Sequence, residues 1–364
     1  MNDLGLYIHV PFCGKKCSYC DFYSVGYSRS AEQLYTEAVI RNIRHYSDKT
    51  IPLDTVYFGG GTPSLLSVGH ISDIISEIGK NFDLTKEAEI TLEANPNTVT
   101  PEKLRELRNI GVNRLSIGVQ SMNDTELSFL GRTHNAERAK KAVLDARDAG
   151  FSNISCDIMI ALPGQTLQSL ERSVELLTAL PINHISAYIL KIESGTPFDC
   201  GEIRSVMPDE DTTSELYLEL IEMLRKRGFF QYEISNFSFP GYESRHNCRY
   251  WKCLDYIGIG PNAHSCYNGR RFAAAPDIQA FIDSPVQPVT ITDDSPCGFE
   301  EYTMLRLRLT EGLDLDSVAE HREQIEKKIP PLLKAGYVKY NGSSVSLTEK
   351  GFLMSNSVIG FLIF

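Results

Sequence analysis

The sequence has no apolar run long enough to cross a membrane, no excess of positive charge and a single tryptophan. No hydrophobic stretch approaches the about 20 residues that span a bilayer. Lys and Arg total 36 against 47 Asp and Glu, a net charge of −11, so general attraction to nucleic-acid phosphates is not expected. Met1-Asn2-Asp3 lacks the basic stretch and apolar core of a secretory signal. We therefore expect a cytoplasmic protein that binds no nucleic acid.

The composition is that of a soluble globular protein, with 42% hydrophobic and 23% charged residues. The 364 residues predict two to three domains, and no tandem repeat or low-complexity segment is present.

Buried strands and amphipathic helices alternate six times in the first two thirds of the chain. The expected strands are residues 6–10, 56–58, 88–92, 114–119, 154–160 and 185–190. The expected helices are residues 32–46, 65–78, 102–110, 136–149, 167–180 and 209–227. This order predicts an α/β fold with parallel strands, either an incomplete (β/α)6 barrel or a doubly wound sheet.

Polar or flexible residues follow the expected strands, which favours the barrel. In such barrels the site lies at the carboxyl ends of the strands. The residues concerned are the cysteines after the first strand, Gly59–Pro63 after the second, Glu93 after the third, Gln120 ending the fourth, and Asp157 near the end of the fifth.

Two further parts are expected after the barrel, which we assign to residues 1–227. Residues 228–290 read as a small α+β extension of short irregular pieces, with residues 285–296 as a linker. Residues 291–364 read as a winged-helix-like domain of two helices, a hairpin turning at Asn341-Gly342, and a last helix. Residues 300–364 carry eight basic and nine acidic side chains, so this domain lacks the basic face of a DNA reader.

Nine cysteines point to metal chemistry, because disulfides rarely persist in a reducing cytoplasm. Cys13-x3-Cys17-x2-Cys20 offers three thiolates in one loop. Three thiolates suit a [4Fe–4S] cluster whose fourth iron stays open to another ligand. A zinc site completed by His9 is the alternative.

The cysteine spacing, with the aromatic Tyr19 before the last cysteine, resembles the radical S-adenosylmethionine (SAM) superfamily. The resemblance implies that SAM chelates the fourth iron and that one electron from the cluster breaks its S–C5′ bond. It also implies a set of SAM contacts from the barrel. These are Tyr7, Tyr19, Gly60, Gly61, Thr62, Glu93, Gln120, Arg132 and Asp157.

Within that superfamily, the chain is similar to the branch of the oxygen-independent coproporphyrinogen III dehydrogenases and the haem chaperones. The matching stretches include Tyr7–Cys13, Gly59–Ser64, Leu92–Pro96, Arg114–Gln120 and Leu162–Thr166. Ile160-Ala161 departs from the aromatic and glycine that are common in this branch.

Two features resemble the haem chaperones rather than the dehydrogenases. Phe22 stands where the dehydrogenases have a further cysteine, and the cluster loop begins at Cys13 without their amino-terminal extension. The segment 246–251 matches the chaperones' HNxxYW motif, which implies that His246, Asn247, Tyr250 and Trp251 contact haem. The residue that ligates the haem iron is left open among four candidates, His246, Cys248, Tyr250 and His264. Cys253 and Cys266 are interpreted as small buried hydrophobic residues.

The resemblance implies haem, haem-accepting proteins and an electron donor such as flavodoxin or ferredoxin as partners, with transient approach to a membrane. Two other functions remain open at this stage. One is oxidative decarboxylation of the propionates of coproporphyrinogen III, and the other is a binding module stabilised by zinc or a cluster without radical chemistry.

Overall fold

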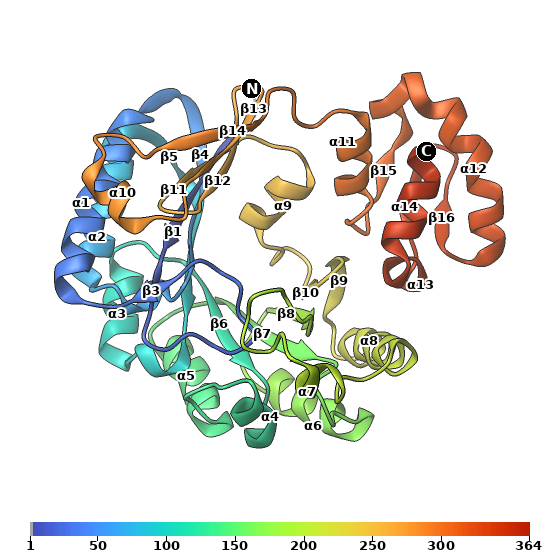
Figure 1. The fold of residues 1–364 in the computed structure, drawn as a ribbon, viewed down its shortest axis with the longest axis horizontal. Coiled ribbons are helices and arrows are strands. Elements are labelled where there is room, and N and C mark those ends of the chain that lie inside the picture. The colour runs from blue at the N-terminus through green and yellow to red at the C-terminus, as the bar shows by residue number, and fades with distance from the viewer. Residues whose placement is uncertain (1–2) are drawn as a thin grey trace.

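A twelve-stranded sheet forms the centre of the computed structural model, which describes residues 3–364 (Figure 1). All six strands expected from the sequence are present and run parallel. They are β1 (Leu4–Val10), β4 (Asp48–Gly60), β5 (Phe82–Ala94), β6 (Arg114–Gln120), β7 (Asn153–Ile160) and β8 (His184–Ile189).

Helices follow these strands and cover the outer side of the curved sheet (Figure 1). They are α1 (Arg29–His45), α2 (Val68–Asn81), α3 (Pro101–Asn109), α4 (Asp124–Phe129), α5 (Ala136–Asp148), α6 (Leu167–Thr178), α7 (Gly201–Arg204) and α8 (Glu210–Arg225). The sheet ends at β14 and β9 without closing. The incomplete barrel is therefore confirmed, and the doubly wound alternative, which needs helices on both faces, is not adopted.

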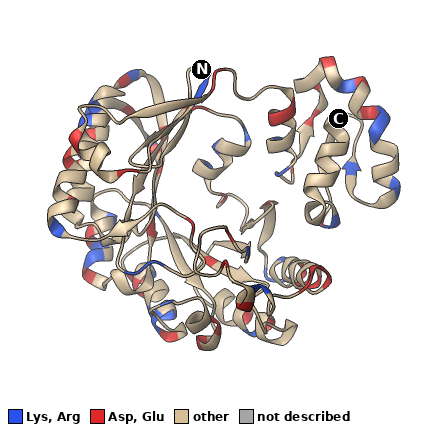
Figure 2. Ribbon diagram, viewed as in Figure 1, with Lys and Arg blue, Asp and Glu red and all other residues tan. Residues whose placement is uncertain are grey.

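Local sequence explains where these helices begin. The side chain of Ser28 accepts a hydrogen bond from the backbone of Ala31, and Thr100 does the same for Lys103 ahead of a proline at the first turn of α3. Charged side chains occupy the outer helices, whereas the central strands carry few of them (Figure 2). Each helix thus presents its apolar face to the sheet.

Residues 228–290 do not form a separate layer, because their strands extend both ends of the sheet. β9 (Phe230–Glu233) and β10 (Asn236–Ser238) continue from β8, while β11 (Tyr256–Ile259) pairs with β1 in parallel and leads to β12 (His264–Tyr267) and β13 (Arg270–Ala274). The expected linker at residues 285–296 is wrong, since β14 (Val289–Asp293) pairs with β13. The segment also carries α9 (Arg245–Trp251) and α10 (Ile278–Asp283).

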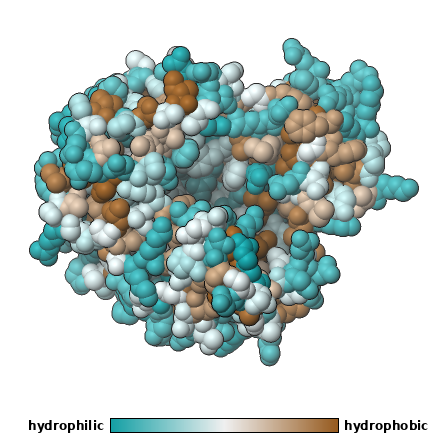
Figure 3. Space-filling view, in the orientation of Figure 1, coloured by the Kyte–Doolittle hydropathy of each residue, from teal (hydrophilic) through white to brown (hydrophobic). Residues whose placement is uncertain are grey.

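The carboxyl-terminal part has the expected winged-helix-like order. Its elements are α11 (Phe299–Arg306), β15 (Leu313–Asp314), the 3-10 helix η3 (Leu315–His321), α12 (Arg322–Ala335), β16 (Val338–Tyr340), β17 (Ser344–Leu347), α13 (Glu349–Leu353) and α14 (Ser355–Ile363). Its strands form their own sheet in the order β15-β17-β16. Figure 3 shows a hollow near the middle of one face, between this domain and the barrel.

Four short elements shape the site described below. β2 (Phe12–Cys13) and β3 (Val25–Gly26) bracket the cysteine loop, and the 3-10 helices η1 (Pro63–Leu65) and η2 (Pro96–Thr98) follow β4 and β5. No helix within residues 3–364 is long and apolar enough to span a membrane.

Candidate functional site

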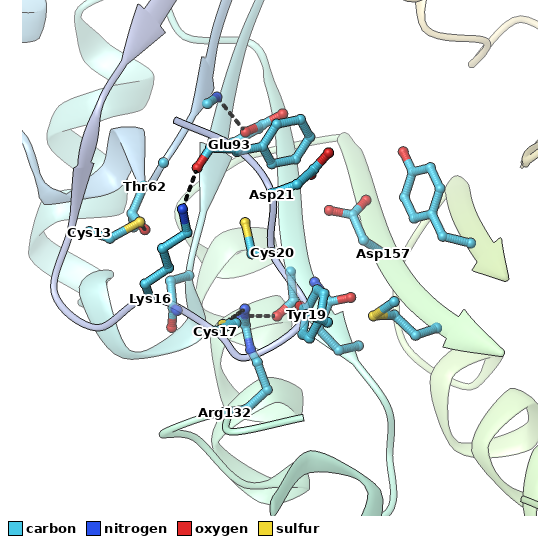
Figure 4. A pocket seen from close by; sticks show the side chains of 18 of the residues that line it. Cys13, Lys16, Cys17, Tyr19, Cys20, Asp21, Thr62, Glu93, Arg132 and Asp157 are labelled. Atoms are coloured by element: carbon cyan, nitrogen blue, oxygen red, sulfur yellow. Dashed lines mark hydrogen bonds between the residues drawn. The ribbon is translucent and has the colours of Figure 1, made fainter. Parts of the chain in front are cut away.

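One cavity of about 430 Å³ lies at the carboxyl ends of the barrel strands (Figure 4). All three clustered cysteines line it, together with eight of the nine expected SAM contacts. Its lining includes Cys13, Cys17, Cys20, Tyr19, Gly60, Gly61, Thr62, Glu93, Gln120, Arg132 and Asp157. The fold therefore brings together residues that lie up to 144 positions apart in the sequence.

The cysteine loop is held at both of its ends. β2 pairs with β3, and the backbone of Val25 donates to the carbonyl of Pro11 at 2.7 Å. Phe12 is fully buried and packs edge-on against Tyr35, with ring centroids 5.4 Å apart. The loop that carries the cysteines is thus fixed to the barrel wall, which limits the entropy that cofactor binding would have to remove.

The glycine loop after β4 lies directly against the cysteine loop. The backbone of Gly61 donates to the carbonyl of Val10 at 2.8 Å, and a Cβ at Gly61 would lie 2.7 Å from the carbonyl oxygen of Phe12. Gly60 adopts φ +109°, which favours glycine. The Thr62 hydroxyl lies 3.7 Å from Cys13 Sγ. A side chain at Gly61 would force the two loops apart, and one at Gly60 would collide with the His9 ring on β1.

Glu93, next to the last residue of β5, is the most perturbed carboxyl group in the cavity. Its Oε1 accepts from the Tyr57 hydroxyl at 2.9 Å and its Oε2 from the Gly60 backbone at 3.1 Å. Burial, reinforced by the nearby Asp157 carboxylate, raises the pKa of Glu93 to about 7. A cationic ligand group beside it would favour the ionised form, so this carboxyl is suited to an ammonium group.

Asp157 reaches the same cavity from β7. Burial raises the pKa of its carboxyl, although the Ser116 hydroxyl donates to Oδ1 at 3.1 Å and opposes the shift. The sequence prediction overlooked Ser116, which lies in β6 and lines the cavity. Two carboxyl groups with raised pKa values and a hydroxyl therefore form one polar wall.

Arg132 connects β6 to the cysteine loop. One guanidinium nitrogen donates to the carbonyl of Gly118 at 2.8 Å and another lies 3.4 Å from Cys17 Sγ, while its Nε has no partner. A Cβ at Gly118 would lie 3.2 Å from this guanidinium and 3.0 Å from the amide nitrogen of Gln120. Glycine at position 118 therefore lets both polar side chains approach the cavity.

The donor set fits a [4Fe–4S] cluster better than a single metal ion. Within residues 3–364, no three His, Cys, Asp or Glu side chains converge on a position for one ion. Zinc requires such convergence, whereas each thiolate of a cluster binds its own iron. His9 is not a free fourth ligand, because its ring nitrogens are hydrogen-bonded to the Tyr7 hydroxyl and the Tyr23 carbonyl.

Tyr7 is the expected SAM contact that the structure does not bring to the cavity. Its hydroxyl bonds to His9 Nδ1 at 3.1 Å, and its ring lies beside that of Tyr57. The ring packs behind Gly59, where a Cβ would lie 2.9 Å from it.

The cavity also contains residues that the sequence prediction missed. They are Lys15, Lys16, Asp21, Phe22, Ala94, Asn95, Ser116, Gly118, Met159, Tyr188, Ile189, Lys191 and Glu193. Tyr188, Ile189 and Lys191 lie at or just after the end of β8, so the strand-end rule applied to the sixth strand would have found them.

Ile160-Ala161, which replaces the aromatic and glycine common in this branch, strains the backbone at Ala161. Ala161 adopts φ +59°, the left-handed region that a glycine at this position occupies without a Cβ clash. Its N–H donates to the Gln165 side chain at 2.8 Å, and this bond holds the turn in place.

The HNxxYW segment forms α9, which lies away from the cysteine cavity. The carboxylate of Glu89 accepts from the backbone N–H groups of Arg245 and His246, both at 3.2 Å. The Arg249 side chain approaches Gly5 so closely that a Cβ there would lie 2.6 Å from it. Gly5 and Glu89 lie before the carboxyl ends of β1 and β5, and the cysteine cavity lies at those carboxyl ends. We therefore place α9 at the end of the barrel opposite the cavity.

His246 is fully buried, and both of its ring nitrogens are occupied. Nδ1 is hydrogen-bonded to the Thr55 hydroxyl and Nε2 to the Tyr250 hydroxyl, each at 2.9 Å. Burial, with the nearby Arg249 charge, lowers the pKa of His246 to about 3. The two motif residues His246 and Tyr250 are therefore hydrogen-bonded to each other in this structure.

The other two motif residues are partly accessible. Asn247 is half-buried, and its backbone N–H completes the first turn of α9 with the Ser244 side chain. Trp251 is half-buried beneath the guanidinium of Arg308, 5.7 Å from the ring centre. Of the four motif residues, His246 is thus fully buried, whereas Asn247, Tyr250 and Trp251 are half-buried, and Trp251 lies against the carboxyl-terminal part of the chain.

Comparison with known proteins places these features in a family. The radical SAM superfamily model matches residues 7–177, and the HemN C-terminal domain model matches residues 299–354. The heme chaperone HemW of Bacillus subtilis is 34% identical over 369 residues, covering 97% of each chain. That of Lactococcus lactis is 32% identical over 362 residues, covering 97% of this chain and 95% of the relative. The chain belongs to the HemW family of radical SAM proteins.

A solved structure shows the same fold along the whole length. The coproporphyrinogen III oxidase HemN of Escherichia coli superposes with a TM-score of 0.82 at 22% identity, covering 99% of this chain and 90% of that one. HemW-family membership agrees with the resemblance inferred from the sequence, including its α/β barrel and its carboxyl-terminal domain.

Proposed function

We propose that this HemW-family protein is a haem chaperone that carries a [4Fe–4S] cluster and SAM and delivers haem to acceptor haemoproteins. The observation that carries the proposal is the single cavity in which three thiols meet polar side chains from successive strand ends. The names of the relatives HemW from Bacillus subtilis and Lactococcus lactis support the haem part.

Cys13, Cys17 and Cys20 would hold the cluster, and SAM would occupy the remainder of the cavity. When both are bound, the cluster would supply the one electron that reductively cleaves SAM. Glu93, hydrogen-bonded to the Gly60 backbone, is suited to the amino group of SAM. Arg132 lies close enough to Cys17 to stabilise negative charge on its sulfur.

Oxidative decarboxylation of coproporphyrinogen is the less favoured function. Phe22, which takes the place of the further cysteine of the dehydrogenases, is 59% exposed and lines the mouth of the cavity. An apolar ring at this position offers a packing surface and no sulfur chemistry. The likeness to HemN at 22% identity is a likeness of fold and does not favour its reaction here.

His264 is the haem-iron ligand that we propose among the four candidates. Its imidazole is exposed at the start of β12. Since β11 runs parallel to β1, the turn before His264 lies at the same end of the barrel as the cysteine loop, and Gly260 in that turn packs against the His9 carbonyl. By contrast, burial raises the pKa of Cys248 to about 12, which keeps its thiol protonated.

Haem-accepting proteins, a reductant such as flavodoxin or ferredoxin, and transient approach to a membrane complete the proposal. A reductant is needed because SAM cleavage consumes one electron. Delivery of haem to acceptors embedded in a membrane would require the protein to approach that membrane.

The test is anaerobic reconstitution, followed by iron and sulfide analysis, EPR, and haem titration. We expect four irons per chain, 5′-deoxyadenosine after dithionite reduction with SAM, and haem transfer to an apo-haemoprotein. Formation of protoporphyrinogen from coproporphyrinogen would favour the dehydrogenase instead. Absence of 5′-deoxyadenosine would favour a binding module without radical chemistry.

The haem ligand is tested by three histidine variants. His264→Ala should weaken haem binding about tenfold or more, with an unchanged cluster signal. His45→Ala, at an exposed histidine on α1, is the matched control and should bind haem normally. Loss of haem in His246→Ala together with normal binding by His264→Ala would return the ligand to the motif helix.

A further inference from the structure

Three cysteines outside the cluster loop meet between the sheet extension and the carboxyl-terminal domain. Cys253 follows α9, Cys266 lies in β12, and Cys297 precedes α11. Cys266 is 5% exposed, whereas Cys253 and Cys297 are half-buried. The sequence interpretation of Cys253 as a buried hydrophobic residue is therefore wrong, and that of Cys266 agrees with the structure.

A chain of contacts fixes this group, which we call the thiol cluster. Cys266 pairs with Tyr256 and with Arg271 across neighbouring strands. Arg271 forms an ion pair with Glu301, and the same carboxylate accepts from the backbone N–H of Cys297 at 2.7 Å. Figure 1 shows α9 and α11 beside each other, which brings the Cys253 loop to the same place.

Cys297 lies between the other two thiols of the cluster, because its side chain is hydrogen-bonded to those of both Cys253 and Cys266. Of these two partners, Cys253 is the more exposed. A hydrogen bond with Cys297 lowers the pKa of Cys253, and the same bond raises the pKa of Cys297 to about 11. Both residues also adopt the left-handed backbone region, with φ +52° and +64°, which is strained for a residue with a side chain. Two adjacent thiols are thus held in uncommon conformations by the surrounding structure.

Metal binding does not explain this cluster. No three potential ligands among residues 3–364 converge on one ion position. The thiol cluster also lies outside the cavity that holds Cys13, Cys17 and Cys20.

We propose that Cys253 and Cys297 form a reversible redox site that is oxidised to a disulfide by low-molecular-weight disulfides. The Cys253 thiolate attacks one sulfur of the small disulfide, which forms a mixed disulfide and releases one thiolate. Cys297 then loses its proton and attacks the Cys253 sulfur, releasing the second thiolate. Two protein thiols are oxidised and one small disulfide is reduced to two thiols.

The bond would tie the loop after α9 to the start of α11. It would fix the carboxyl-terminal domain against the helix that covers the barrel end. In a reducing compartment such a bond is transient, which suits a sensor rather than a structural crosslink. The inference does not depend on haem binding.

The experiment uses the full chain with its cluster loaded anaerobically, so that iron protects the cluster cysteines. The protein is treated with oxidised glutathione, alkylated, digested with trypsin and analysed by mass spectrometry. Cleavage after Lys252, Arg270 and Arg306 places Cys253 and Cys266 in one peptide and Cys297 in another. We expect these two peptides to be linked, with fragment ions assigning the bond to Cys253.

Variants distinguish this pair from its neighbour. Cys297→Ser and Cys253→Ser should abolish the linked peptides, whereas Cys266→Ser and the distant Cys200→Ser should retain them. Wild-type protein without linked peptides, a bond within the peptide 253–270, or stable glutathione adducts alone would overturn the proposal. The wild-type result decides the question even where a variant fails to fold.

Discussion

Replacing Glu93 by glutamine should make the cluster-free protein more stable at alkaline pH. The carboxyl keeps its proton up to about pH 7 in the folded protein and loses it near 4.5 when unfolded. The folded state therefore binds more protons between these values, and stability falls as the pH rises through them. Glutamine cannot ionise, so the variant escapes this loss.

The magnitude follows from the shift of about 7 − 4.5 = 2.5 units. At about 1.4 kcal/mol per unit, ionisation of Glu93 costs the folded protein about 3 kcal/mol at pH 8 and less than about 1 kcal/mol at pH 5. The glutamine amide has one oxygen to accept from the two donors, Tyr57 and Gly60, so one hydrogen bond is lost. This loss lowers the free energy of unfolding of the variant by about 1 kcal/mol at every pH.

We therefore expect Glu93→Gln to match the wild type at pH 5 and to exceed its stability by about 2 kcal/mol at pH 8. Urea titration monitored by fluorescence of Trp251, the single tryptophan, measures the difference. Glu219→Gln, at an exposed position on α8, should show no such change. A difference between Glu93→Gln and wild type that stays constant from pH 5 to pH 8 would refute the argument.

Three further substitutions test the site. Cys17→Ala should abolish the [4Fe–4S] EPR signal, because two thiolates remain in the loop. Gly118→Ala should weaken SAM binding about tenfold in equilibrium dialysis, since the added Cβ crowds Arg132 at 3.2 Å. Ala161→Gly should raise the free energy of unfolding by about 1 kcal/mol, because φ +59° suits glycine.

Each substitution has a matched control. Cys200→Ala, at a cysteine outside both cysteine groups, should retain the cluster signal. Gly79→Ala, where a Cβ meets nothing within 4 Å, should leave SAM binding unchanged. Ala146→Gly, inside α5, should lower stability by about 1 kcal/mol or more. A stabilised Ala146→Gly or a destabilised Ala161→Gly would contradict the backbone explanation.

The cysteine spacing and the strand-end residues were recognisable in the sequence, because both depend on local order. A thiolate triad is defined by residues within one loop, and parallel strands place their carboxyl ends at one rim whatever their exact lengths. Glu93 and Asp157 could therefore be assigned to one site although 64 residues separate them.

The haem motif and the thiol cluster were decided by tertiary structure. As residue types, His246 and Tyr250 are compatible with ligation of haem iron. Only their packing, with His246 bonded to Thr55 and Glu89, shows that they lie at the end of the barrel opposite the cysteine cavity. Likewise, Cys253 and Cys297 lie 44 residues apart and are brought near each other because α9 contacts α11 and Arg271 of β13 forms an ion pair with Glu301 of α11. Contacts between segments that are distant in the sequence depend on how the whole chain folds. No local sequence pattern encodes them.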